Sequence, residues 1–370
     1  MLGALLLAGS CTRTLDPANG NDYGAIGFDV AVVLHADDAT KSSTLNENTR
    51  FALGEKFRVY GRRVGEGRNT RIFGNDGELV EWYNNGTAGD TSDDYWKYSP
   101  LSYWYWVSQS NYYDFLAVSP DPDGSGQSER MTDGGGNDIP GNLAVTKSYS
   151  ITVNGSGVLQ PGTDLLMAGT RRTGANAATR TDKVPLTFKH MLSAVKVVVT
   201  NDSDANSLTL NSIKFDNLIH TAKAKVTIDA TGLPEFSWID TQRKSDKVTV
   251  SSPGSTLTTS SRTYDPAAYD LFIPADLTVA IDGSLNPDSS KLPHLIVNFT
   301  PAGGSATEET IPLTDIQKSR YGTDDPLLEW EPGIRYTYNI SIRLDGGVFV
   351  TVVTTEWDPI TAETPGLLID

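Results

Sequence analysis

Residues 184–199, VPLTFKHMLSAVKVVV, give the clearest indication of the fold class of this chain. Apolar residues occupy every second position in two groups separated by a break: Val184, Leu186 and Phe188, then Val195, Val197 and Val199. Period two is typical of half-buried β-strands, because successive side chains of a strand face opposite sides of the sheet. The stretch therefore predicts two consecutive strands, each with one face in a hydrophobic core.

The same alternation recurs towards both ends of the chain. Residues Ala25–Leu34 carry apolar side chains at alternate positions: Ile26, Phe28, Val30, Val32 and Leu34. Arg335–Ile342 also alternates, and the turn residues Asp345-Gly346-Gly347 before Val348–Val353 predict a β-hairpin. Only the short stretch Glu309–Arg320 favours a helix. We therefore expect an all-β chain.

At about 150 residues per domain, the 370 residues predict two domains, or one large all-β unit. We expect a signal and tether in residues 1–21, one β-sandwich in residues 22–181 and a second in residues 182–370. Leu101–Val107 and Tyr113–Val118 are expected to be aromatic-rich strands of the first sandwich.

Composition excludes several classes of protein. Lys and Arg total 30 against 46 Asp and Glu, and the resulting net charge of −16 argues against a nucleic-acid partner. A single cysteine excludes an internal disulfide framework and a cysteine-based zinc site. No run of about 18 apolar residues is present, so the sequence predicts no transmembrane helix.

The start of the chain resembles a bacterial lipoprotein signal. Residues 1–10, MLGALLLAGS, are apolar and end in small residues, and the only cysteine, Cys11, follows directly. Such a segment directs export, and acyl chains on the cysteine then anchor the protein to a membrane. We therefore predict lipidation at Cys11; the alternative is an incidental N-terminal cysteine.

Catalytic and metal-binding motifs are missing from the sequence. The four histidines are far apart and form no ligand pair: His35, His190, His220 and His294. The sequence contains no nucleophile elbow, P-loop or dinucleotide fingerprint. The acidic segment Asp121–Gly126 resembles the start of a calcium loop, but Thr132 stands where a Glu ligand is needed, which favours a solvated loop. We expect no enzymatic activity, no metal and no cofactor.

Clustered aromatic residues are candidates for glycan contacts. They are Trp104, Trp106, Tyr112 and Tyr113. Because alternate residues of a strand face opposite sides, at most half of such a cluster can point into one core. The outward half would bind a glycan or cover a neighbouring loop, and packing within the core is the alternative role. A surface-anchored glycan-binding lipoprotein is the second functional hypothesis.

The first strand carries a feature that bears on assembly. The polar stretch after Ala25–Leu34 contains Lys41 and ends at Arg50, and both are cleavage points for a trypsin-type protease. Cleavage there would release the strand and leave an apolar groove with open backbone groups, which a strand of another chain could fill. The alternative is an ordinary first strand followed by a long loop.

These segments, in this order, resemble the fimbrillin family of Bacteroidetes bacteria. The likeness rests on Cys11, Ile26-Gly27-Phe28, Leu53–Gly61, Tyr105-Trp106 with Tyr113–Pro120, Asp164–Ala168 leading to Val184–Val197, and Tyr336–Trp357. The resemblance implies two transthyretin-like β-sandwich domains, export as a lipoprotein to the outer membrane, and assembly into a fimbrium with other subunits. His190 would then be a packing residue and no ligand.

The resemblance also implies that an Arg- or Lys-specific protease removes the first strand, so that subunits assemble by donor-strand exchange. Ala25–Leu34 would be the removed strand, and Arg50 is favoured over Lys41 because it directly precedes the next strand-like stretch. The expected partners are other fimbrial subunits, the membrane through a lipid anchor, and host or bacterial surface glycans or proteins. Residues 358–370 contain two prolines and lack alternation, which makes them a poor donor strand and leaves an anchor, tip or accessory position open.

Overall fold

The computed structural model describes residues 24–33, 56–65, 67–74, 76–83, 95–104, 111–120, 144–174, 183–203, 206–284, 288–320, 323–343 and 347–356. In these ranges the chain forms strands and two short 3-10 turns, η4 (Ser289–Lys291) and η5 (Leu313–Asp315). The all-β prediction is confirmed. The same residues contain no helix with the length and apolar character of a membrane span.

Twenty-five strands make up the described fold. The first half of the chain contributes β1 (Phe28–Val33), β2 (Lys56–Gly65), β3 (Arg68–Arg71), β4 (Glu78–Tyr83), β5 (Tyr95–Lys97), β6 (Tyr112–Ser119), β7 (Ala144–Ser150), β8 (Leu166–Thr173) and β9 (Val184–His190). The second half contributes β10 (Ser193–Asn201), β11 (Leu208–Asp216), β12 (Ile219–Ile228), β13 (Pro234–Arg243), β14 (Val248–Ser251), β15 (Ser255–Leu257), β16 (Thr263–Tyr264), β17 (Asp270–Phe272), β18 (Ala275–Asp276), β19 (His294–Pro301), β20 (Thr307–Pro312), β21 (Gln317–Arg320), β22 (Thr323–Pro326), β23 (Glu329–Trp330), β24 (Ile334–Arg343) and β25 (Gly347–Glu356).

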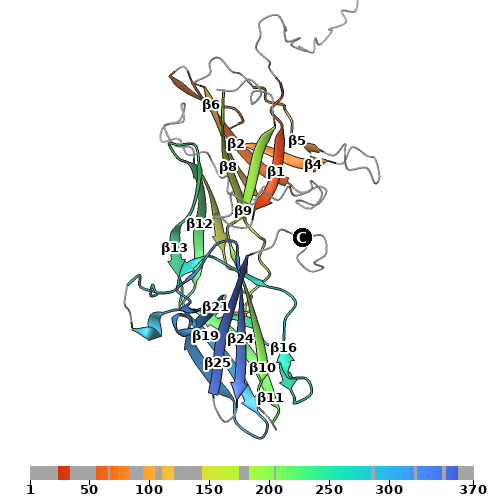
Figure 1. Ribbon diagram of the computed structural model, residues 1–370, viewed down its shortest axis with the longest axis vertical. Coiled ribbons are helices and arrows are strands. Elements are labelled where there is room, and N and C mark those ends of the chain that lie inside the picture. Colours follow the sequence, from red (N-terminus) through yellow and green to blue (C-terminus); the bar gives the residue numbers. More distant parts are fainter. Residues whose placement is uncertain are drawn as a thin grey trace, which may run out of the picture.

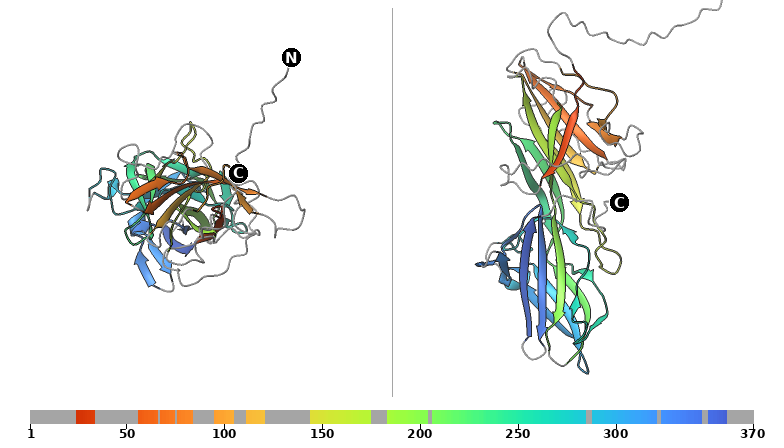
Figure 2. Two further views of the ribbon diagram at one scale, coloured as in Figure 1. Left: turned by 90° about the horizontal axis from the view of Figure 1, so that it is seen from above. Right: turned by 45° about the vertical axis from the view of Figure 1, so that its right-hand side comes forward.

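An eight-stranded sheet forms one end of the elongated molecule (Figures 1 and 2). Its strand order is β1-β9-β8-β6-β2-β4-β5, with β3 added to β2. Strand β9 belongs to this sheet through its pairing with β1 and β8. The expected boundary between two domains, between residues 181 and 182, stays a prediction.

Two further sheets form the other end of the molecule. One has the order β16-β10-β24-β25-β21-β22, with β17 added to β10, and the other has the order β14-β11-β19-β20, with β15 added to β11. The predicted hairpin is confirmed, since β24 and β25 pair antiparallel, from Ile334 opposite Glu356 to Arg343 opposite Gly347. Gly347 has φ of 96°, a left-handed conformation that favours glycine where the chain re-enters the sheet.

A three-stranded sheet, β13-β12-β7, lies between the two ends (Figure 1). Strand β7 comes from the first half of the chain but pairs with β12 of the second half, Val145 opposite Val226. This sheet packs against β6 and β8 of the eight-stranded sheet. Strand β6 is therefore buried on both faces, with Phe115 in one apolar cluster and Leu116 in the other.

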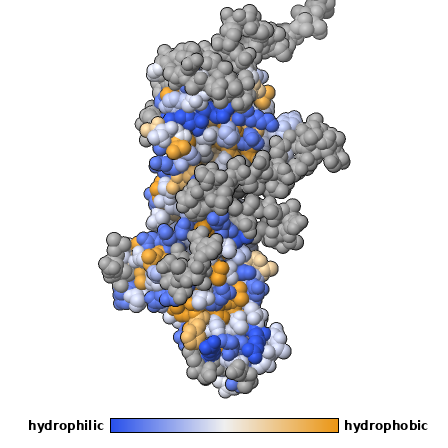
Figure 3. Space-filling model, in the orientation of Figure 1, coloured by the Kyte–Doolittle hydropathy of each residue, from blue (hydrophilic) through white to orange (hydrophobic). Residues whose placement is uncertain are grey.

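The alternating residues that predict strands lie in the core. Val184, Leu186 and Phe188 of β9 are buried in the cluster of the eight-stranded sheet, and Val195, Val197 and Val199 of β10 are buried in the larger cluster. The outer surface is mainly hydrophilic on the face drawn in Figure 3, with scattered apolar patches. Such scattered exposure is ordinary for a folded protein.

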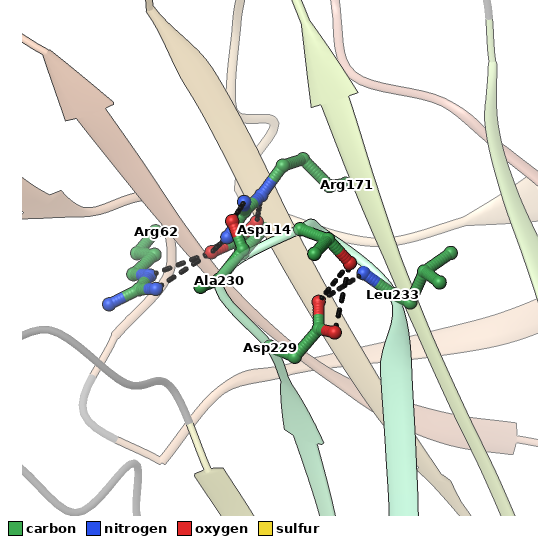
Figure 4. A network of polar contacts seen from close by, with 7 residues as sticks. Arg62, Asp114, Arg171, Asp229, Ala230 and Leu233 are labelled. Carbon is green, nitrogen blue, oxygen red and sulfur yellow. Dashed lines mark hydrogen bonds and ion pairs between the residues drawn. The ribbon is translucent and has the colours of Figure 1, made fainter.

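A buried ion network joins the eight-stranded sheet to the tip of the β12–β13 hairpin (Figure 4). The Asp114 carboxylate accepts hydrogen bonds from Nε and Nη2 of Arg62 at 3.0 and 2.8 Å, and from Nε of Arg171 at 2.6 Å. Nη1 of Arg171 also donates to the carbonyl of Ala230 at 3.2 Å. Asp229 accepts from the backbone N–H of Leu233 at 2.8 Å and shapes that tip.

Two expected elements are wrong. Glu309–Arg320 is no helix: it forms the end of β20, the turn η5 and β21. Strand β20 pairs with β19, from Pro312 opposite His294 to Thr307 opposite Phe299. This pairing outweighs the weak helical preference of a short segment. Of the expected strand Leu101–Val107, residues 101–104 form no regular strand and make an isolated bridge between Tyr103 and Ala25, and residues 105–107 lie outside the described part.

Candidate functional site

The first strand, β1, lies at the end of the eight-stranded sheet beside β9. The two strands pair in parallel, from Phe28 opposite Val184 to Val33 opposite Lys189. Just before β1, the chain pairs antiparallel with another segment: the N–H of Ile26 donates to the carbonyl of Ser102 at 2.9 Å, and the N–H of Trp104 donates to Gly24 at 3.0 Å. Residues 24–33 thus join two separate backbone ladders.

Alternate side chains of this segment enter the core. Ile26, Phe28 and Val30 are 1%, 2% and 3% exposed, whereas Asp29 is exposed. These residues confirm the predicted alternation, and Val32 continues β1 as part of its backbone ladder. Burying each such side chain contributes about 1.5–3 kcal/mol. The first strand therefore closes the core of its sheet.

Phe28 fills a pocket of aromatic rings. Its ring centroid lies 5.9 Å from Phe57 of β2, 5.7 Å from Tyr98, 6.3 Å from Phe73 and 6.3 Å from Phe115 of β6. The contact between Phe28 and Phe57 also shows that the sheet curls, because β1 and β2 are far apart in its strand order.

Tyr98 fixes the backbone at the start of the strand. Its hydroxyl donates to the carbonyl of Ile26 at 2.7 Å and accepts from the N–H of Ser102 at 3.2 Å. Burial raises the pKa of Tyr98 to about 12, so the phenol stays protonated and able to donate. Sequence patterns did not identify this residue, because it follows a strand of three residues that is too short for a periodic signal.

The predicted processing sites Lys41 and Arg50 lie between β1 and β2, outside the described residues. Cys11, which precedes β1, is also outside the described residues. Their roles stay predictions. The position of the two basic residues in the sequence is such that one cut would separate β1 from the rest of the chain.

The aromatic cluster is mainly part of the core. Trp104 and Tyr113 are 0% and 1% exposed and pack edge to face at 4.9 Å. Neither can offer a ring face to a glycan, so the glycan hypothesis is wrong for these two residues. Tyr112 is half-buried beneath the guanidinium of Arg171, 4.1 Å from its ring centroid, and Trp106 lies outside the described residues.

His190 is a packing residue, as expected, and it has a carboxylate partner. Its Nδ1 lies 2.5 Å from Oδ2 of Asp164, and both side chains are buried. Asp164 lies just before β8, and His190 is the last residue of β9, opposite Leu166 of β8. Within the described ranges, no group of three or more His, Cys, Asp and Glu residues is arranged to hold a metal ion.

The last described strand, β25, is amphipathic. Val352 is buried, while Phe349 and Val353 on its other face are exposed. β25 pairs along its whole length with β24, and residues 357–370 lie beyond the described part.

Comparison with known proteins gives one family and a set of similar folds. The model of the Fimbrillin-like family matches residues 40–357. A fimbrial protein from Bacteroides vulgatus is 16% identical, with 90% of this chain and 99% of that chain covered and a TM-score of 0.49. A fimbrilin from Porphyromonas gingivalis is 10% identical, with coverages of 91% and 98% and a TM-score of 0.43. The tip fimbrial protein Mfa3 of the same organism is 11% identical, with coverages of 83% and 95% and a TM-score of 0.41. No curated protein matches the chain.

Proposed function

The chain belongs to the fimbrillin-like family, and on that basis we propose that it is a subunit of a fimbrium on the surface of a Bacteroidales cell. It serves as a stalk, anchor, tip or accessory adhesin subunit and assembles with other fimbrial subunits. Its role is structural and adhesive.

One observation carries the assembly mechanism that we propose. Strand β1 lies at the end of its sheet, and its residues Phe28 and Val30, with Ile26 just before it, fill the core. A strand in that position can be withdrawn without crossing another strand, and its withdrawal exposes the backbone of β9 together with the apolar pockets. An extended segment from another subunit satisfies both by β-strand addition.

A protease prepares this exchange by cutting between β1 and β2. Arg50 is the proposed cleavage point and Lys41 the second candidate. A complete inserted strand would contribute a backbone ladder and several buried side chains that all have to open together, which predicts a very slow dissociation.

Export and anchoring form the second part of the proposal. Cys11 is acylated after removal of the preceding apolar residues, which places the subunit at the outer membrane before cleavage. Labelling of growing cells with an alkyne fatty acid tests this step: the wild-type chain should be labelled, and the variant Cys11→Ser should not.

Limited proteolysis tests the exchange. Residues 12–370 are treated with an Arg-specific protease and examined by N-terminal sequencing and by an SDS gel without heating. The expected cut follows Arg50, and an SDS-resistant ladder is expected if the subunit forms a stalk by itself. The variant Arg50→Gln should resist this protease, and Lys41→Gln is its matched control.

The possible outcomes separate the alternatives. A cut without a ladder assigns the chain to a position that needs a different subunit as donor. Resistance of the folded wild-type chain at Arg50 to this protease, together with resistance at Lys41 to a Lys-specific protease, contradicts the removable strand.

A further inference from the structure

We propose that the strand which replaces β1 carries an aromatic residue at the position of Phe28 and comes from a different subunit. This inference rests on the proposed function, in which β1 leaves the sheet after cleavage. It adds the chemistry that the incoming strand needs.

The rings around Phe28 form a pocket that does not depend on Phe28 itself. Phe73 contacts Tyr98 at 5.8 Å and Phe115 at 6.4 Å, and Phe57 contacts Phe188 of β9 at 5.3 Å. These five rings come from five separate segments, and each keeps at least one aromatic neighbour other than Phe28. We therefore expect the pocket to remain in place when β1 is withdrawn.

An aliphatic side chain cannot fill this pocket. Edge-to-face contacts, such as those of Phe28 with Phe57 and Phe115, require a ring in the central position. A leucine or valine there would leave part of the pocket empty, and close-packed interiors do not compensate for such voids. The positions of Ile26 and Val30 in the same segment accept aliphatic residues. The aromatic requirement thus applies to one position and fixes the register of the strand.

Residues 358–370 of this chain do not satisfy the requirement. They read DPITAETPGLLID and contain no aromatic residue. Phe349 is held in β25 by its full pairing with β24. The geometry therefore favours a donor strand from a different subunit over one supplied by residues 358–370 of a second copy.

A peptide-exchange experiment on the chain cleaved at Arg50 tests the requirement. The fluorescent probe is a peptide of residues 24–34, GAIGFDVAVVL. Unlabelled competitors are the same peptide, the swapped peptide with Ile26→Phe and Phe28→Ile, the peptide with Phe28→Leu, and residues 358–370. The swapped peptide is a matched control because its composition is unchanged. It is expected to compete at least about 100-fold more weakly than the native peptide, since the pocket loses its ring and a smaller site receives one.

The results distinguish the two levels of the proposal. If the native peptide does not enter the cleaved chain from which the N-terminal fragment has been released, strand exchange itself is wrong, and the proposed function fails with it. If the native and swapped peptides compete equally, exchange stands and the aromatic requirement is wrong. Competition by residues 358–370 equal to that of the native peptide would overturn the choice of a different subunit.

A second measurement covers the case in which the cleaved chain retains its own strand. Release of the cleaved N-terminal fragment in dilute urea is followed by size-exclusion chromatography. The fragment of the variant Phe28→Leu should leave about tenfold faster than the wild-type fragment, and the fragment of Asp29→Ala, an exposed position, should leave at the wild-type rate. Equal rates for all three contradict the inference.

Discussion

Arg171 and Asp114 form a double contact, with Nε 2.6 Å from Oδ1 and Nη2 3.0 Å from Oδ2. Asp114 is fully buried and also binds Arg62, which is 1% exposed, so one carboxylate neutralises part of the charge of two guanidinium groups. Because Arg171 also reaches the carbonyl of Ala230, this contact joins the eight-stranded sheet to the β12–β13 hairpin.

Removal of this carboxylate should be strongly destabilising. The substitution Asp114→Ala removes the carboxylate that binds the buried guanidinium of Arg62, and loss of one partner from a buried ion pair costs about 3–5 kcal/mol. Urea unfolding measures the effect. The control is Lys223→Ala, which removes the exposed ion pair with Asp240 and should change stability little. Similar losses for the two variants would contradict a special role for Asp114.

The Tyr98 hydroxyl should hold the start of the first strand. Tyr98→Phe removes the hydrogen bond to the carbonyl of Ile26 and should lower the free energy of unfolding by about 1 kcal/mol. Hydrogen exchange at residues 24–30 should become faster in this variant. Tyr95→Phe is the matched control, because Tyr95 is largely exposed. Unchanged exchange in Tyr98→Phe would show that the hydroxyl does not secure the strand.

Gly169 of β8 packs tightly against the three-stranded sheet and against Leu116. A Cβ atom there would lie 2.9 Å from Cβ of Pro234, 3.0 Å from Cδ2 of Leu116 and 3.1 Å from Cδ1 of Ile228. Gly169→Ala should therefore lower the midpoint of thermal unfolding, with a cost of about 1–3 kcal/mol from overpacking. Gly155→Ala is the control, since a Cβ at Gly155 has no neighbour within 4 Å. A stability of Gly169→Ala equal to that of this control would contradict the close packing.

Asp270 should make the protein less stable as the pH rises from acid to neutral. Burial raises the pKa of Asp270 to about 6 from the ordinary 3.8. Between these two pKa values the folded state binds the proton more tightly than the unfolded state. The contribution of Asp270 is therefore most favourable below about pH 4 and is lost as the pH passes the folded pKa.

The variant Asp270→Asn tests this dependence. It should raise the free energy of unfolding above about pH 7 by up to about 3 kcal/mol and make little difference below about pH 4. Urea unfolding across this range measures the change, with the exposed Asp246→Asn as control. A constant difference between wild type and Asp270→Asn at every pH would contradict the prediction.

Alternation in the sequence identified the strands but not their partners. The period of β1, β9, β10 and β24 shows which side chains enter a core, because each strand has an inner and an outer face. The parallel pairing of β1 with β9, and the pairing of β7 with β12, depend on contacts between segments that are distant in the sequence, and a local pattern contains no information on them.

Only part of the candidate site could be predicted, because a local sequence pattern does not show which distant segments meet. The two-residue alternation of apolar side chains identifies Ile26, Phe28 and Val30. Tyr98 and Phe73 do not, because both lie in short irregular segments and reach the site only through the fold. Trp104 and Tyr113 were ambiguous, since an aromatic residue in a strand is equally suited to a core and to an exposed surface, and burial decides between the two.

The pairing of Phe28 with Val184 has a consequence for how the chain folds. Contacts between residues so distant in the sequence form late, because the intervening loop has to close first. A chain that emerges with its N-terminus first exposes the first strand before its partner has appeared. The strand that closes the core therefore docks only after β9 has emerged, and we expect a chaperone or an early protease to meet it while it is still free.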